Sequence, residues 1–262
     1  MCTSKWDAIS SLANCLVRNN SQGSKSIEKK DEVRRLACLA LNTLSIPFEN
    51  KNVMIHGPHF RLLVGNMTKV IRMQVPETTY LCCICLMNLS CLEDGVEQIM
   101  KFSPLFSARE PSPRRRCRSN SLTPWLDDPN STLRSLESLM KDQQPFLMSR
   151  TFSVEGEAIR WAVGLLRNLT RTNNHCAMIA KTEIPALVLG FVERTPHPVI
   201  KWATDSLEEM SLTVVDQLAA CPESCEKLKE SGAAYILGSI KTGAGQSKIK
   251  GKISSIFKSL EG

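Results

Sequence analysis

The feature that most constrains the fold is an apolar pattern that returns along the chain. It is clearest in WAVGLLRNLT, residues 161–170, which WATDSLEEMS echoes 41 residues later. The alignment pairs Trp161 with Trp202, Ala162 with Ala203, Leu166 with Leu207 and Leu169 with Met210. Positions that recur at offsets 0, 3, 4 and 7 lie on one face of an α-helix, so the echo predicts two equivalent helices.

Three more stretches fit the same frame. They are LACLALNTLS from residue 36, LCCICLMNLS from residue 81 and GKISSIFKSL from residue 251. Five copies in one phase predict five equivalent helices in an all-α chain. We expect them near 31–45, 76–91, 155–170, 197–212 and 247–260.

The segments between these copies repeat as well. Each holds a short helical stretch and then a medium one, which opens for example at EIPALV with Pro185 in the first turn, where its missing N–H costs nothing. A unit is therefore a short, a medium and a longer third helix, with a period of 41 to 50 residues. Such long-period similarity is typical of α-solenoids, whose units bury their apolar faces only against neighbours.

The stretch NNHCAMIAKTEIPALVLGFVERTPHPVIKWATDSLEEMS, preceded by AIRWAVGLLRNLT, resembles the armadillo repeat. The shared marks are an Asn in L-x-N-L near the end of the third helix, a short first helix after it, and x-I-P-x-L-V opening the second. The resemblance covers about 155–240 and, less closely, 31–102. It implies a right-handed α-solenoid of about five armadillo-like repeats. HEAT repeats, which share the period but usually have two helices, are the alternative.

One long insertion interrupts the array. The segment 103–130 holds five Pro among 28 residues, many Ser, and four Arg between 114 and 118. Such a composition cannot bury enough apolar surface to offset its ordering entropy, so we expect disorder there. This gives armadillo-like repeats in 1–102, the insertion in 103–130, and further repeats in 131–262. Ser131 is expected to cap the first helix after the insertion.

Three serines stand in a basophilic kinase pattern. Ser119 and Ser121 follow R-x-R-x-x-S, and Ser153 has an Arg three residues before it. Phosphorylation would place about −2 of charge on each serine and could switch a docking event. The pattern makes a kinase and a phosphoserine reader of the 14-3-3 type candidate partners. A solvated basic loop is the alternative.

The cysteine content and the lack of long apolar runs indicate the cellular compartment of the protein. Eleven Cys is an odd number, and many lie in apolar helical runs, which favours free thiols in a reducing compartment over disulfides. The sequence contains no run of 18 apolar residues, so it predicts no membrane span. The stretch MCTSKWDAIS lacks the layout of a secretory signal. We therefore expect a cytoplasmic or nuclear protein.

Signals for an enzyme are weak. GQSKIKGKIS at 245–254 has the wrong spacing for a phosphate-binding loop, and Ile253 stands where Ser or Thr would hold Mg²⁺. Cys82 and Cys85 form a C-x-x-C, but they occupy core positions of the repeat, where Cys acts as a small hydrophobe. The sequence predicts no catalytic residue, no metal ligand and no cofactor.

The resemblance to armadillo repeats points to the surface formed by the third helices. In that family the Asn of L-x-N-L often binds the backbone of an extended peptide, which here transfers to Asn88 and Asn168; helping to end the helix is the alternative role. Asp205 and Glu209, one turn apart, are predicted to form an acidic spot that favours a basic partner, or else a solvated face.

These observations predict a non-catalytic scaffold or adaptor that binds an extended or helical segment of a protein partner. One alternative is a module of a larger machine, such as a GTPase regulator or the substrate-recognition part of a ubiquitin ligase. Another is a basic repeat protein that binds nucleic acid, which the scarcity of aromatics among the charges disfavours.

Overall fold

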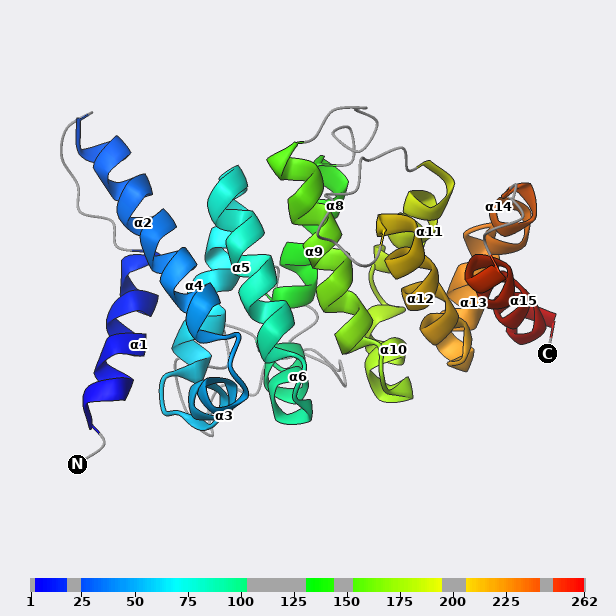
Figure 1. Ribbon diagram of the computed structural model, residues 1–262. Helices are drawn as coiled ribbons and strands as arrows, with labels where there is room; N and C mark the ends of the chain where they lie inside the picture. The colour runs from blue at the N-terminus through cyan, green and yellow to red at the C-terminus, as the bar shows by residue number, and fades with distance from the viewer. Residues whose placement is uncertain are drawn as a thin grey trace, which may run out of the picture. The chain divides into compact units, whose positions relative to one another are not determined.

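A computed structural model describes residues 3–17, 25–102, 131–143, 153–194, 206–240 and 247–261. These residues form fourteen α-helices and no strand, which confirms the all-α prediction (Figure 1). The chain divides into two compact units, Met1–Leu139 and Met140–Gly262.

The N-terminal unit contains six complete helices and most of a seventh. They are α1 (Thr3–Cys15), α2 (Lys25–Leu44), α3 (Phe48–His56), α4 (Phe60–Met73), α5 (Pro76–Leu89), α6 (Glu93–Met100) and α8 (Thr132–Gln143), which crosses the unit boundary. α4 shows why these segments are helical: Phe60, Leu63, Met67 and Ile71 recur every three or four residues and are all buried. The helix ends at Gln74, whose left-handed φ of 53° turns the chain.

The C-terminal unit contains seven complete helices. They are α9 (Val154–Leu169), α10 (Asn173–Ile179), α11 (Ile184–Arg194), α12 (Leu207–Ala219), α13 (Pro222–Glu230), α14 (Ala233–Ser239) and α15 (Ser247–Glu261). Side-chain caps fix several starts: Ser153 accepts from the Gly156 N–H, and Thr172 accepts from the His175 N–H. Ser206 and Glu209 form a capping box at the start of α12.

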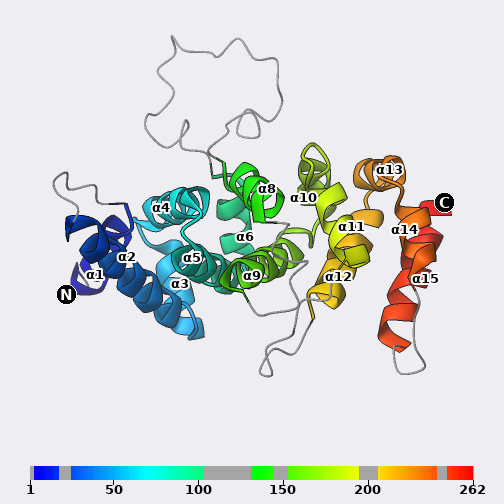
Figure 2. The ribbon, with the colours of Figure 1, turned by 90° about the horizontal axis from the view of Figure 1, so that it is seen from above.

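Within each unit, helices that the sequence predicts to hold the same place in successive repeats pack on one another. In the N-terminal unit α1 packs on α4 and α2 on α5; in the C-terminal unit α9 packs on α12, α12 on α15, α10 on α13 and α11 on α14 (Figure 2). We call α2, α5, α9, α12 and α15 the third helices, since each ends a unit of the period predicted from the sequence. The equivalent positions of successive units therefore meet inside each compact unit.

Four of the five third helices lie where the sequence predicts them, but the fourth does not. α12 runs from Leu207 to Ala219 instead of near 197–212, so the pairing of Leu169 with Met210 was wrong. A leucine lies three residues before the start cap of the helix that follows each third helix. The leucines are Leu44, Leu89, Leu169 and Leu218, and the corresponding caps are Pro47, Leu92, Thr172 and Cys221. Leu169 and Leu218 are 49 residues apart, which puts the echo out of register by eight residues, close to two helical turns.

The first helix after the predicted insertion begins as expected. The Oγ of Ser131 accepts a hydrogen bond of 3.4 Å from the Arg134 N–H, and the apolar side chains of α8 are buried. The boundary between the two compact units falls inside α8, between Leu139 and Met140, and the hydroxyls of Thr132 and of Thr68 on α4 lie 3.3 Å apart. The predicted domain bounds 1–102, 103–130 and 131–262 stay a prediction.

Some predictions concern residues that the structure does not describe. They include the insertion 103–130 and the position of Trp202. Among the described helices, none alone is long and apolar enough to cross a membrane; the pair α10 and α11, bent by 93°, passes that test only when its two parts are taken together.

Candidate functional site

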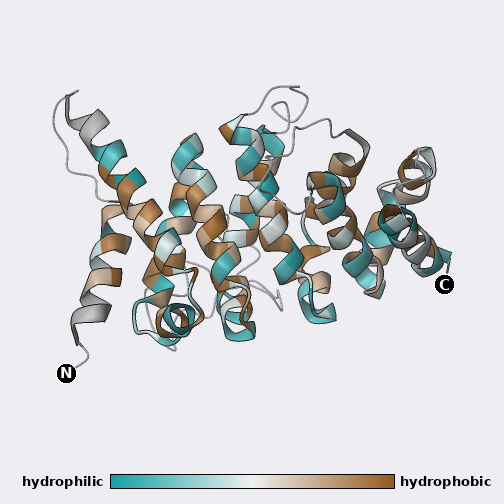
Figure 3. Cartoon of the chain, in the orientation of Figure 1, coloured by the Kyte–Doolittle hydropathy of each residue, from teal (hydrophilic) through white to brown (hydrophobic). Residues whose placement is uncertain are grey.

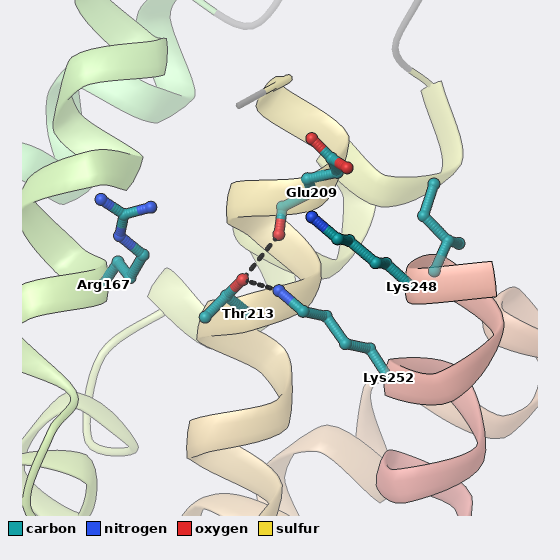
Figure 4. Close-up of a pocket in the computed structure, with 6 residues that line it drawn as sticks. Arg167, Glu209, Thr213, Lys248 and Lys252 are labelled. Atoms are coloured by element: carbon teal, nitrogen blue, oxygen red, sulfur yellow. Dashed lines mark hydrogen bonds between the residues drawn. The ribbon is translucent and has the colours of Figure 1, made fainter. Parts of the chain in front are cut away.

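The third helices of the C-terminal unit enclose a cavity that gathers charged side chains. Arg167 comes from α9, Glu209 and Thr213 from α12, and Lys248, Ile249 and Lys252 from α15 (Figure 4). The cavity has a volume of about 260 Å³. We refer to these six residues as the basic cavity, because three of them are cationic and one is anionic.

Hydrogen bonds hold part of this cavity in place. The Lys252 ammonium donates to the Thr213 hydroxyl, which in turn donates to the Glu209 carbonyl at 2.7 Å (Figure 4). The Glu209 carboxylate is engaged elsewhere, since its Oε2 accepts the Ser206 N–H at 3.2 Å. Among the described residues that line the cavity, Glu209 supplies one carboxylate, which also takes part in the helix cap, and three side chains are cationic.

The sequence predicted an acidic spot formed by Glu209 and Asp205 that would favour a basic partner. Asp205 lies outside the described residues, so this spot stays a prediction. Among the described residues, Glu209 lines the cavity together with Arg167, Lys248 and Lys252.

Asn88 lies at the end of α5 and contacts the end of α2. Its Nδ2 donates to the Ser45 Oγ at 3.0 Å and to the Asn42 Oδ1 at 3.3 Å. The side chain is partly buried between the two helices. These bonds join successive third helices, which is a role inside the unit; the peptide-binding role of Asn88 stays a prediction.

Asn168 lies at the matching place on α9 and is more enclosed. Its side chain belongs to a residue that is only 3% exposed, and its Oδ1 accepts a 2.7 Å hydrogen bond from Arg171. A partner that binds the Asn168 Oδ1 would compete with this charge-assisted bond. Its predicted role in binding also remains untested.

In the corrected register, Gln217 holds the position on α12 that Asn88 holds on α5 and Asn168 holds on α9. It immediately precedes Leu218, as Asn88 precedes Leu89 and Asn168 precedes Leu169. The hydroxyl of Thr170, just after α9, donates to the Gln217 Oε1 at 2.7 Å, so the amide–hydroxyl link of Asn88 and Ser45 recurs in the other unit. The sequence signal that could have found Gln217 is Pro222, the first residue of α13, because Pro is favoured at the start of a helix and so indicates that α12 ends before it.

The predicted phosphorylation sites are only partly described. Ser119 and Ser121 lie outside the described residues, while Ser153 is the start cap of α9. Its Oγ accepts the Gly156 N–H at 3.0 Å. Phosphorylation at such a place would set a phosphate at the positive end of a helix, but beside the acidic Glu155 and Glu157.

The thiols of α5 are core groups in this structure. Cys82, Cys83 and Cys85 are buried, and the Sγ atoms of Cys82 and Cys38 lie 3.6 Å apart without a disulfide. Burial raises the pKa of Cys83 and of Cys85 to about 12 and that of Cys82 well above its ordinary value. These thiols stay protonated near neutrality. Among the described residues, no cluster of three His, Cys, Asp or Glu could hold a metal ion.

Comparisons with known proteins assign no family. No family model and no curated protein matches the chain. Among solved structures, one engineered protein shares 13% identity at a TM-score of 0.46 over 97% of this chain and 96% of its own, and a second shares 12% at 0.47 over 97% and 58%. A chain from a structure concerned with a phosphorylation switch in the interaction between cadherin and beta-catenin shares 14% at 0.47, over 98% of this chain and 54% of its own. This chain thus spans little more than half the length of the last two.

Proposed function

We propose that this chain is a non-catalytic protein-binding scaffold of the armadillo type, an α-solenoid whose third helices bind an acidic segment of a partner at the basic cavity. The observation that carries the proposal is the meeting of Arg167, Lys248 and Lys252, from two different third helices, around one cavity. Packing of α9 on α12 and of α12 on α15 places these helices side by side, as an extended ligand requires.

The absence of catalysis is part of the same proposal. The α5 thiols that could act as nucleophiles are buried and protonated, and only the thiolate is a good nucleophile. The odd number of cysteines, many of them in apolar helical runs, favours free thiols, so we propose a cytoplasmic or nuclear location.

Binding of a fluorescent Asp- and Glu-rich peptide tests the proposed site. We expect the double variant Lys248→Glu/Lys252→Glu to bind at least about tenfold more weakly than the unsubstituted chain, since two attractions become repulsions. The difference should shrink as salt rises, because exposed charges are screened over about 10 Å at 0.1 M.

The same helix supplies a matched control. Lys250 and Lys258 are exposed on α15 but do not line the cavity, so Lys250→Glu/Lys258→Glu makes the same change in net charge. We expect this variant to retain most of the affinity. Equal losses in the two variants would mean unspecific attraction and would contradict the site. Stronger binding of a single-stranded RNA than of the peptide, lost in the cavity variant, would favour the nucleic-acid alternative instead.

A further inference from the structure

The helix that supplies two cations of the basic cavity carries them without acidic partners. On α15, Ile249 and Ile256 are buried, and Figure 3 shows apolar residues of this helix, in brown, beside hydrophilic ones, in teal. Lys248 and Lys252 stand at the i and i+4 positions of the same helix, where like charges repel each other. Among the described residues neither ammonium forms an ion pair, and Lys252 donates to the neutral hydroxyl of Thr213. The two lysines therefore bring uncompensated positive charge to the cavity.

Two further features add to this charge. Lys248 is the second residue of α15, and the first turn of the helix contains no acidic residue. That turn carries the positive end of the helix dipole, which stabilises a nearby anion and disfavours a cation. Arg167 of α9 brings a third cation, and in Figure 4 it lies on one side of Thr213 while the lysines lie on the other. With three cations and the carboxylate of Glu209, the lining residues carry a formal net charge of +2.

The size of the cavity limits the group that it can hold. Its volume of about 260 Å³ is below the range of about 300–1,000 Å³ that is typical of sites for drug-sized ligands. One compact group fits such a space better than several side chains of an extended segment do. A carboxylate brings one negative charge, whereas a phosphate monoester brings about −1.5 to −2 at pH 7 and three acceptor oxygens. The phosphate therefore matches the net charge of the cavity more closely than a carboxylate does.

We propose that the basic cavity holds the phosphate of a phosphoserine or phosphothreonine side chain, carried by the acidic segment of the partner. This inference rests on the proposed function, since it names the group that the same site binds. Arg167 suits such a group because a guanidinium donates two parallel hydrogen bonds to phosphate oxygens. Lys248 and Lys252 add point charges, and the Thr213 hydroxyl holds the Lys252 ammonium at the cavity.

Three peptides of one Asp- and Glu-rich sequence, with Ser, Glu or phosphoserine at a central position, test the proposal. We expect the phosphoserine peptide to bind at least about tenfold more tightly than the Glu peptide, because charge-assisted bonds to three oxygens replace those to one carboxylate. This preference should shrink severalfold when the pH falls from about 7.5 to about 5.5, since the phosphate gains a proton with a pKa near 6 while Asp and Glu stay mostly ionised.

Neutral variants of two lysines on the same helix locate the effect. Lys248→Gln should reduce the preference for phosphoserine over Glu severalfold, because it removes one cation from the cavity. Lys250→Gln is the matched control: Lys250 is exposed on α15 and does not line the cavity, so the preference should stay as in the unsubstituted chain.

The outcomes separate this inference from the proposed function. Equal affinity for the Glu and phosphoserine peptides, or a preference that Lys248→Gln leaves intact, would overturn the phosphate assignment while the acidic-segment site stands. Inorganic phosphate that binds as tightly as the phosphoserine peptide would overturn the assignment of the phosphate to a partner segment. If none of the three peptides bound, the proposed function would fail and this inference would fail with it.

Discussion

At the scale of single residues, the corner between α5 and α6 depends on the absence of a side chain. A Cβ on Gly95 would lie 2.2 Å from the Leu89 carbonyl oxygen and 3.0 Å from the Ile55 Cδ1. The first contact is with backbone, so a rotamer change cannot relieve it. Gly95 thus permits the short first helix α6 to approach the end of α5 closely.

Gly95→Ala should destabilise the chain by about 1–3 kcal/mol, the usual cost of overpacking a filled site. Chemical denaturation measures the change. Gly251→Ala on α15 is the control: its Cβ would meet nothing within 4 Å, so alanine should stabilise the helix by up to about 1 kcal/mol. If both substitutions shifted stability in the same direction, the close approach at Gly95 would not be the cause.

At the scale of elements, α2 and α5 meet through thiols and amides. Cys38 and Cys82 are in contact, Cys85 reaches the Leu41 carbonyl, and Asn88 donates to Ser45. The thiols fill the space between the helices and bring no charge at neutral pH. The interface is therefore sensitive to alkaline pH, because ionised thiolates are much better solvated in the unfolded chain.

The pKa shifts give the direction of this sensitivity. The pKa of Cys83 and of Cys85 is raised from 9.0 to about 12, so the folded state keeps protons that the unfolded state loses. Their contribution is fully present below pH 9 and is lost as pH rises toward 12, by about 1 kcal/mol per thiol for each pH unit. As the pH rises from 7 to 10, the urea midpoint of the double variant Cys83→Ala/Cys85→Ala should fall less steeply than that of the unsubstituted chain. Equal slopes for the two chains would contradict the stabilising contribution of the buried, protonated thiols.

The positions of most helices follow from the hydrophobic periodicity of the sequence, but the register of α12 does not. Offsets of 0, 3, 4 and 7 predicted α2, α5, α9 and α15, because a helix that buries one face must show that spacing. Eight residues are close to two helical turns, so a helix shifted by eight residues presents nearly the same apolar face. The Trp161 echo was therefore plausible in the wrong register. The start caps of α10 and α13, Thr172 and Cys221, each lie three residues after a leucine near the end of a third helix and define the correct register.

The candidate site was only partly predictable for the same reason. Glu209 was named as a binding residue, and it does line the basic cavity, but its cationic neighbours come from α9 and α15. Lys248 and Lys252 were visible as charges in the sequence, yet only the packing of α15 on α12 shows that they line one cavity with Thr213. Gln217 was missed because the register error put Glu209 in its place.

At the scale of the whole molecule, the chain divides into two compact units. Leu63 is fully buried in the N-terminal unit, and Leu218 is fully buried in the C-terminal one. Stability is not uniform across a structure, so cooperative unfolding can be confined to one part of a chain. Each unit is thus a candidate for independent local unfolding.

Reciprocal core substitutions distinguish independent units from one cooperative molecule. Leu63→Ala and Leu218→Ala should each cost about 2–5 kcal/mol, because each leaves a cavity in its own core. In hydrogen exchange followed by mass spectrometry, Leu63→Ala should reduce protection in peptides from α4 and α5 and leave those from α9 and α12 unchanged, since the substitution touches only the N-terminal core. Leu218→Ala should give the reverse pattern. The unsubstituted chain supplies the reference for both, and equal loss of protection in the two units with either variant would show that they unfold together.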